Sequence, residues 1–281
     1  MRNNRARHLL TSLVAFAIVL PTIASAAPSA KLWERWLANA PNSPATIDHG
    51  TWDGFLGAHV IAGPAGIHRM DYGAVSPQWR ARLSIYVDEL QNVAISSFDR
   101  AEQLAYWVNL YNALTLRVVL TQYPVESIRD IDLGGGFFAD GPWQRKLVTV
   151  EGEAISLDDI EHRILRPIWK DPRIHYAVNC AAVGCPNLQS VAFDAENTEA
   201  LLDSAARAYV NHPRGAEFVD GRLLVSSIYV WFRRDFGGND AGVIAHLTRY
   251  ADPPLVEELS RTRRIGGHRY DWSLNDSAAA R

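Results

Sequence analysis

The pattern of apolar residues predicts one long, buried helix between Asp99 and Tyr123. Asp99 is a suitable N-cap, and Glu102, three residues later, completes a capping box. Pro124 should end the helix, because proline donates no backbone hydrogen bond and pushes the preceding residue out of helical geometry. Apolar side chains occur on all sides of this helix, so we expect the rest of the protein to surround it.

One polar stripe interrupts this apolar helix. Asn109, Asn112 and Thr115 follow one another at spacings of three and therefore lie near one line along the helix. A buried amide without a partner costs about 1–3 kcal/mol. The stripe must therefore face polar groups, which could belong to the floor of a ligand pocket or to the backbone of a neighbouring loop.

Elsewhere the periodicity predicts mostly helices, with short strands chiefly in hairpins. The expected helices are 31–40, 52–61, one beginning at Ser76-Pro77, 157–165 ended by Pro167, 196–210, 227–236, 241–250 and 254–259; the expected strands are 146–150 with 153–155, 217–219 with 222–225, and 173–178. This pattern favours an α+β fold, a helix-rich single domain whose long buried central helix packs on a small, mainly antiparallel sheet. A papain- or transglutaminase-like arrangement is a distant analogy.

Residues 1–26 have the features of a secretory signal peptide. Arginines precede the apolar run 9–20, and Ala24-Ser25-Ala26 is a small-residue cleavage signal; an uncleaved membrane anchor is the alternative. We expect residues 27–281 to form one periplasmic or secreted domain without a membrane span, with a core at about 76–275 and a helical extension at 31–75. Cleavage would change the net charge from −3 to −6, which argues against a nucleic-acid partner.

The residues best suited to chemistry lie in one short segment. His175, Asn179, Cys180 and Cys185 occur within eleven residues, at the end of the alternating stretch 173–178. A strand there would place His175 and Asn179 on the same face. Two cysteines so close together in an exported protein are usually joined, and closing so short a loop stabilises by roughly 2 kcal/mol.

Two other interpretations of the cysteines remain open. Cys180 could be a nucleophile with His175 beside it and Asn112 orienting the pair, as in papain-like hydrolases. Those enzymes, however, carry the cysteine at the start of a buried helix, and this chain has none there. Alternatively, both thiolates could bind a metal together with His162 and His175. We expect neither a metal nor a cofactor.

Several other segments have open roles. Glu161 could be a buried partner of Arg166 or Arg173. The glycine- and phenylalanine-rich segment 134–138 is a surface loop or a lid, and a phosphate-binding loop is disfavoured because no Lys-Ser or Lys-Thr follows. The tail 270–272 should pack down as a strap, and we expect the core to contain Trp143, Trp169 and Trp231.

Taken together and in order, five groups of residues resemble the domain-of-unknown-function family 547 (DUF547), as in a bacterial exported member. The resemblance runs from about Ser76 to Asn275, and it implies a fold and a shared pocket but no assigned reaction. The segments are Tyr106–Thr115, Leu157–Glu161 with Ile164–Arg166, Arg173–Cys180 with Cys185-Pro186, Asp235–Gly238 and Tyr270–Asn275.

Two hypotheses about function follow. In the first, the protein is a hydrolase or transferase acting on an amide or thioester, with His175, Cys180 and Asn112 as catalytic residues. The binding residues would then be Asn109, Asn179, Glu161 and Cys185. In the second, it is a non-catalytic cell-envelope module that binds a small molecule or a peptide, and a Cys180–Cys185 disulfide is structural.

Overall fold

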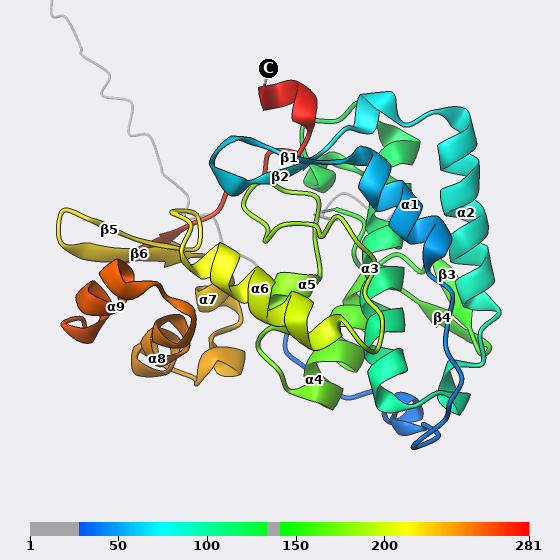
Figure 1. The fold of residues 1–281 in the computed structure, drawn as a ribbon, viewed down its shortest axis with the longest axis horizontal. Helices are drawn as coiled ribbons and strands as arrows, with labels where there is room; N and C mark the ends of the chain where they lie inside the picture. The colour runs from blue at the N-terminus through cyan, green and yellow to red at the C-terminus, as the bar shows by residue number, and fades with distance from the viewer. Residues whose placement is uncertain (1–27, 134–140, 281) are drawn as a thin grey trace, which may run out of the picture.

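A computed structural model describes residues 28–133 and 141–280. The predicted signal peptide and the segment 134–138 lie outside the described residues. Figure 1 shows helix α3 (Arg100–Gln122) in the middle of a group of helices. Its neighbours are α2 (Pro77–Gln91), the π-helix η6 (Asp159–Leu165) and α6 (Thr198–Val210).

Helix α3 confirms the prediction made from its end signals. The Asp99 carboxylate accepts hydrogen bonds from the backbone N–H groups of Ala101 and Glu102, both at 3.0 Å. Every residue from 102 to 116 is buried. The Glu102 side chain does not complete a capping box, because it accepts a hydrogen bond from the backbone of Ile47. Neither α3 nor any other described helix is long and apolar enough to cross a membrane.

The described strands form three small sheets, which confirms the α+β class. Strands β1 (Val60–Ala62) and β2 (His68–Met70) pair antiparallel, as do β3 (Val148–Val150) and β4 (Glu153–Ile155). Strand β6 pairs antiparallel with β5 and parallel with β7. The remaining bounds are β5 (Ala216–Val219), β6 (Arg222–Ser226), β7 (Gly267–Arg269), α1 (Gly50–His59), α4 (Arg166–Trp169), α5 (Ile174–Ala177), α7 (Ile228–Trp231), α8 (Asp240–Tyr250) and α9 (Pro253–Ser260).

The strand predicted at 173–178 is wrong, because this segment forms helix α5. Asp171 caps the turn by accepting from the backbone N–H of Arg173 at 2.8 Å, and the N–H of Tyr176 bonds to the carbonyl of Arg173. Residues 174–179 are all buried, so the apparent alternation in this stretch did not mark one buried face. The argument that His175 and Asn179 share the face of a strand therefore fails.

Three predicted helices differ from the structure. The helix at 157–165 continues to Trp169, since the Arg166 N–H bonds to the Glu161 carbonyl in the π-helix and Pro167 begins the next turn. Residues 31–40 contain only the 3-10 turn η1 (Glu34–Leu37), and the stretch 227–236 is divided between α7 and the 3-10 turn η7 (Arg233–Phe236).

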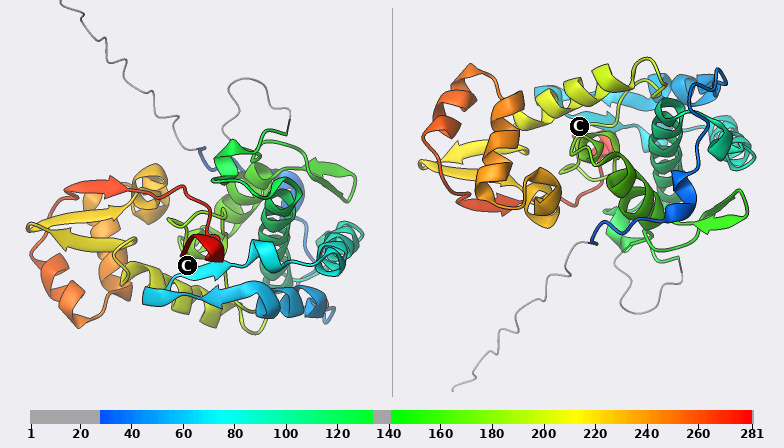
Figure 2. Two further views of the ribbon diagram at one scale, coloured as in Figure 1. Left: turned by 90° about the horizontal axis from the view of Figure 1, so that it is seen from above. Right: turned by 90° about the horizontal axis from the view of Figure 1, so that it is seen from below.

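Two hydrophobic clusters make up the interior. One surrounds α3; the other lies among α6, β5, β6, α8 and α9, at one end of the molecule in both views of Figure 2. Helix α5 lies where they meet. Ile174 and Ala177 pack in the first cluster, and Tyr176 packs in the second. The residue between Ile174 and Tyr176 is His175.

The tail after β7 packs against the loop that contains the cysteines, as the strap interpretation predicted. The N–H groups of Val183 and Gly184 bond to the carbonyls of Ser273 and Asp271, both at 2.8 Å. Asn275 then donates from its backbone to Ala181. The approach is close: a Cβ on Gly184 would lie 2.8 Å from the backbone nitrogen of Asp271.

The replacement Gly184→Ala should therefore displace the tail, and we expect it to lower the free energy of unfolding by about 1–3 kcal/mol. Gly57→Ala is the matched control, because a Cβ there meets nothing within 4 Å inside helix α1. The control should be neutral or stabilising by up to about 1 kcal/mol. Urea unfolding measures both, and equal effects would contradict the docking of the tail on this loop.

Candidate functional site

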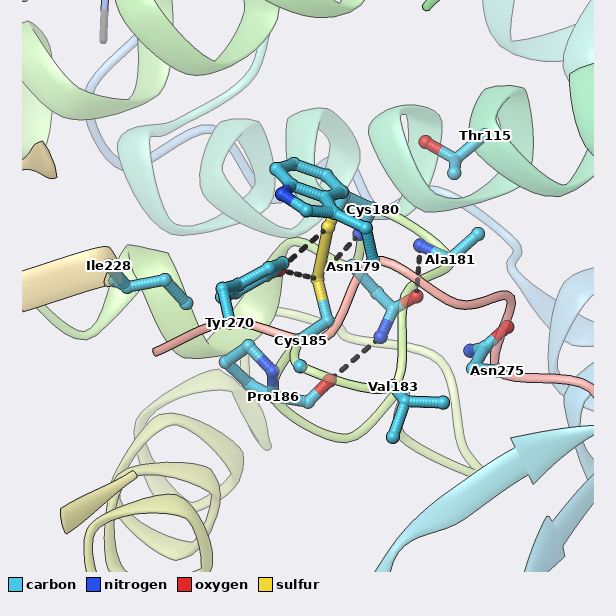
Figure 3. Close-up of a disulfide and its surroundings, with 12 residues drawn as sticks. Thr115, Asn179, Cys180, Ala181, Val183, Cys185, Pro186, Ile228, Tyr270 and Asn275 are labelled. Atoms are coloured by element: carbon cyan, nitrogen blue, oxygen red, sulfur yellow. Dashed lines mark hydrogen bonds between the residues drawn. A yellow bond between two sulfur atoms is a disulfide. The ribbon is translucent and has the colours of Figure 1, made fainter. Parts of the chain in front are cut away.

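The two cysteines form a disulfide, which confirms the first interpretation of their spacing. Cys180 and Cys185 have Cα atoms 6.3 Å apart (Figure 3). Cys180 is partly exposed, whereas Cys185 is only 3% exposed. Neither sulfur is a free thiolate in this state, so a resting nucleophile or a zinc site with two thiolates would first require reduction.

Two asparagines hold the backbone that leads into this disulfide. The Asn112 side chain donates to the carbonyl of Ala177 at 2.9 Å and accepts from the N–H of Asn179 at 2.8 Å. The Asn179 side chain in turn donates to Pro186 at 2.7 Å and accepts from Ala181 at 2.8 Å (Figure 3). Both ends of each amide thus bond to main chain.

The rest of the polar stripe on α3 has similar partners. Asn109 donates to the carbonyl of Phe193 at 2.7 Å and accepts from the N–H of the same residue at 3.1 Å. Thr115 donates to the carbonyl of Tyr111, one turn back in its own helix. The stripe therefore faces the main chain of the two segments, around 177–179 and at 193, that cross α3.

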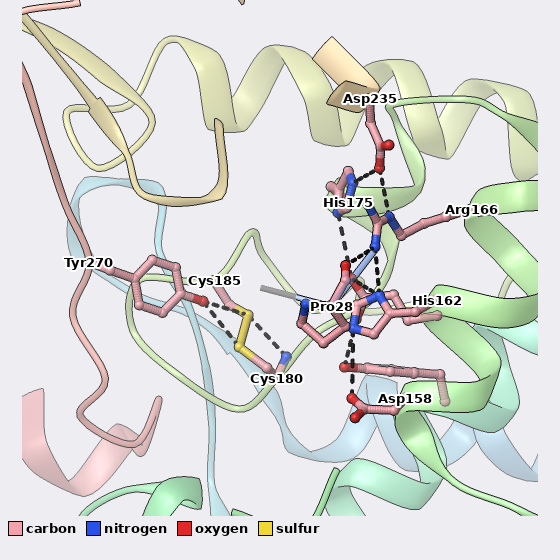
Figure 4. Close-up of polar contacts among 11 residues, drawn as sticks. Pro28, Asp158, His162, Arg166, His175, Cys180, Cys185, Asp235 and Tyr270 are labelled. Carbon is pink, nitrogen blue, oxygen red and sulfur yellow. Dashed lines mark hydrogen bonds and ion pairs between the residues drawn. A yellow bond between two sulfur atoms is a disulfide. The ribbon is translucent and has the colours of Figure 1, made fainter. Parts of the chain in front are cut away.

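His175 lies between two carboxylates, and Figure 4 shows it beside one of them, Asp235. Its Nε2 is 2.8 Å from Oδ2 of Asp235, and its Nδ1 is 3.6 Å from Oε1 of Glu161. The Tyr111 hydroxyl donates to the other Glu161 oxygen at 3.2 Å. The ring of Phe232 stacks on the imidazole at 4.4 Å. Both ring nitrogens of His175 thus face acidic partners, and the ring is 3% exposed.

Arg166 completes this buried ionic cluster. Its Nε donates to Asp235 at 2.6 Å, and its Nη1 donates to the carbonyl of Pro28 and to Nδ1 of His162, both at 2.9 Å. Because Nδ1 of His162 accepts, this histidine fits the neutral form with its proton on Nε2. That nitrogen faces Asp158 at 3.7 Å.

The electrostatics of the cluster follow from burial and these partners. Burial opposes ionisation of Glu161 and Asp235, yet interactions with neighbouring residues hold the pKa of each at about 2. These neighbours are His162, His175 and Arg166 for Glu161, and His175 and Arg166 for Asp235. Burial lowers the pKa of His162 to about 4. Burial, with the charges of Glu161 and Asp159, raises the pKa of Asp158 to about 6.

Sequence reasoning missed the partners of His175 and of the cysteines. Glu161 meets His175 and Tyr111, while Arg173 pairs instead with Asp171, Glu199 and Asp203. Asp235 and Tyr270 were not predicted as site residues. Each stood in a segment that carried the family resemblance, which is the signal that could have suggested them.

Within residues 28–133 and 141–280, no three His, Cys, Asp or Glu side chains are arranged to hold a metal ion. A shallow polar depression lies between α2 and the β3–β4 hairpin and contains none of the predicted site residues. Its lining is Asp88, Gln91, Asn92, Thr149, Glu151 and Gly152.

The family model for "Protein of unknown function, DUF547" matches residues 95–210. This stretch of the chain is similar to the DUF547 family. The matched span includes α3, the β3–β4 hairpin, η6, α5, the disulfide loop and α6. The matched span is shorter than the stretch from 76 to 275 over which the sequence resembles the family, and it does not include Asp235 or Tyr270. Comparison with curated proteins and with solved structures finds no match.

The geometry predicts that removing a buried amide of α3 lowers the stability of the fold. Asn112→Ala would leave the buried carbonyl of Ala177 and the buried N–H of Asn179 without their partner, so we expect the unfolding free energy to fall by about 2–4 kcal/mol. The control Thr115→Val removes only a bond within the helix and should cost less than about 1 kcal/mol. An Asn112→Ala variant as stable as the wild type would contradict this role.

The ionic cluster predicts a specific dependence of stability on pH. Since the folded-state pKa values of Glu161 and Asp235 lie near 2, their contribution is full above about pH 4–5 and is lost as the pH falls towards 2. His162 also destabilises the folded state as the pH falls from about 6.5 to 4, since the unfolded chain binds its proton more readily. Asp158 has the opposite effect between about pH 6 and 4, because its carboxyl binds a proton more readily in the folded state.

Asp158→Asn should therefore reveal the loss of stability that His162 causes as the pH falls. In urea unfolding from pH 7 to pH 4, this variant should lose stability more steeply than the wild type as the pH falls. Asp88→Asn, at a mostly exposed carboxylate, is the control and should follow the wild type. Parallel curves for Asp158→Asn and the wild type would show that these two groups do not oppose each other.

Proposed function

We propose that this DUF547 protein is an exported, non-catalytic module that binds a peptide through a partly exposed aromatic patch. The patch consists of Trp143, Trp231, Tyr270 and Trp272, which are all half-buried and lie beside the disulfide loop. This single observation carries the proposal. Large aromatic side chains that stay partly exposed together are typical of interaction sites, whereas isolated ones are common on any surface.

The four rings of the patch contact one another. Tyr270 contacts Trp231 and Trp272, with ring centroids 4.8 and 4.7 Å away, and these two tryptophans stack on each other at 5.7 Å. Trp143 meets Trp272 edge-on at 5.8 Å. The expectation that Trp143, Trp169 and Trp231 are core residues is wrong, since all three are half-buried. Trp143 and Trp272 pack against the first hydrophobic cluster, and Trp231 and Tyr270 pack against the second.

The chemistry of the patch fits a peptide with an apolar or aromatic side chain. Aromatic rings gain from edge and offset contacts with further rings, and Trp and Tyr add a polar group at the rim. The guanidinium of Arg129 lies 5.2 Å from the Trp272 ring, and the exposed residues Asp271 and Ser273 adjoin it. An apolar centre with a polar rim is the usual anatomy of a protein-binding surface.

The contacts at the cysteines and His175 favour binding over the hydrolase or transferase hypothesis. That hypothesis needs a thiolate on Cys180, which is bonded to Cys185. It also needs a basic nitrogen on His175, where both nitrogens face carboxylates. Asn112, the expected orienting residue, bonds to main chain instead. Turnover of an amide or thioester stays a prediction that these contacts do not support.

Binding can be tested with short blocked peptides that carry a central Phe, Leu or Gly. We expect the Phe and Leu peptides to raise the melting temperature and change the tryptophan fluorescence of the wild type, and the Gly peptide to have no effect. Trp272→Ala should weaken binding at least about tenfold, because the ring is central to the patch. Trp79→Ala removes a half-buried tryptophan elsewhere and should bind like the wild type.

Either of two results would overturn the binding proposal. One is the absence of any response to the Phe and Leu peptides. The other is an equal loss of affinity in the Trp79→Ala and Trp272→Ala variants. Hydrolysis of a model thioester or amide by the wild type would instead restore the enzyme hypothesis.

Export has its own support and its own test. The Cys180–Cys185 disulfide supports it, because disulfides persist in oxidising compartments and are rare in the cytosol. When the full chain is expressed in a Gram-negative bacterium, we expect mass spectrometry of the protein from the periplasmic fraction to show an N-terminus at Ala27. Intact protein that begins at Met1 in the cytoplasmic fraction would contradict export.

A further inference from the structure

The disulfide joins two sulfurs in unequal surroundings. Cys180 is partly exposed, whereas Cys185 is buried. The Tyr270 hydroxyl lies 3.1 Å from Sγ of Cys180 and 3.2 Å from Sγ of Cys185 (Figure 4). In addition, the backbone N–H of Cys180 donates to Sγ of Cys185 at 3.0 Å. The buried sulfur therefore has one donor of its own, the N–H of Cys180, and lies within reach of a second donor, the Tyr270 hydroxyl, which it shares with Cys180.

Both donors are held by contacts that do not depend on the disulfide. The ring of Tyr270 packs against Trp231 and Trp272. The backbone nitrogen of Cys180 follows Asn179, whose own N–H is bonded to Asn112. These donors would therefore stay near Cys185 if the bond between the sulfurs were broken.

We propose that Cys180–Cys185 is a redox-active disulfide that exchanges with an external dithiol, with Cys180 as the attacked sulfur and Cys185 as the leaving sulfur. A thiolate of the dithiol attacks Sγ of Cys180, the bond between the two cysteines breaks, and its electron pair leaves on Cys185. The second thiolate of the dithiol then attacks the other sulfur of the dithiol, which is bonded to Cys180. This step closes the disulfide of the external molecule and releases Cys180 as a thiolate.

Electrons and protons balance in this exchange. The dithiol loses two electrons and two protons and becomes a disulfide, while the protein gains both and carries two thiols. An external disulfide such as oxidised glutathione returns the protein to its starting state by the reverse steps. No other oxidant or reductant takes part.

The polar contacts favour this direction of attack. Exchange is faster when the leaving sulfur is a stable thiolate, and hydrogen bonds from N–H and O–H donors stabilise that thiolate. Cys185 has such donors from both Cys180 and Tyr270. Access favours Cys180, because this residue is partly exposed whereas Cys185 is buried.

The loop has enough other contacts to remain folded after reduction. The Tyr209 hydroxyl donates to the carbonyl of Gly184 at 2.6 Å, and Arg214 donates to the carbonyl of Val183 at 2.9 Å. The tail holds the same two residues through their N–H groups. A reduced protein with the native fold is therefore expected, as exchange requires.

A matched pair of cysteine variants tests which sulfur is attacked. Cys185→Ser keeps the partly exposed thiol and should form a mixed disulfide with oxidised glutathione under native conditions, as mass spectrometry would show. Cys180→Ser keeps the buried thiol and should react at least about tenfold more slowly. Equal rates, or a faster Cys180→Ser, would overturn the assignment. Glutathione has no aromatic ring, so the result is independent of peptide binding to the patch.

A second matched pair tests the role of the tyrosine in the intact disulfide. Oxidised wild-type protein should be reduced by dithiothreitol without denaturant, with an unchanged circular dichroism spectrum. Tyr270→Phe should slow this reduction by roughly tenfold. Tyr209 holds the same loop without contacting a sulfur, so Tyr209→Phe should be reduced at nearly the wild-type rate. Reduction only in denaturant would show a purely structural disulfide, and equal rates for the two variants would exclude the donor role of Tyr270.

Discussion

The position of His175 between Glu161 and Asp235 is the interaction on which the arrangement of the site depends. Glu161 belongs to η6 in the first hydrophobic cluster, and Asp235 belongs to η7 beside the second. Burying three ionisable groups is unfavourable unless each one has a partner. Arg166 supplies a positive charge to Asp235, and these contacts fix the two hydrophobic clusters relative to each other.

The segment after His175 takes its geometry from this junction. Asn112 holds residues 177 and 179 against α3, and Asn179 then shapes the turn into Cys180. On the far side of the disulfide, Tyr270 contacts both sulfurs and belongs to an aromatic patch that also packs on both clusters. Ionic contacts and aromatic contacts thus meet at one loop, which is why both proposals concern the same part of the protein.

Local signals predicted what is locally determined. The cap at Asp99 and the stop at Pro124 gave the bounds of α3, and the Glu151-Gly152 and Asp220-Gly221 turns gave two hairpins. The segment 173–178 was assigned to a strand because its residues alternate in character. Residues 174–178 are all buried, so this alternation carries no information about a face. Capping by Asp171 was the competing local signal.

The partners in the site could not be derived from spacing alone. His175 and Asp235 are 60 positions apart, and Cys180 and Tyr270 are 90 apart, so only tertiary packing brings them together. The buried amides of α3 were correctly expected to need polar partners. Sequence could not decide whether those partners were a ligand or the main chain, since either one satisfies an amide equally well.

A double-mutant cycle on His175 and Asp235 tests the central claim most directly. The free energies of unfolding of His175→Ala, Asp235→Asn and the double variant would be measured in urea at pH 7. Because the two side chains share a partly buried, charge-assisted hydrogen bond, we predict a coupling energy above about 1 kcal/mol. Effects that add to within about 0.5 kcal/mol would show that this histidine does not join the two clusters through Asp235.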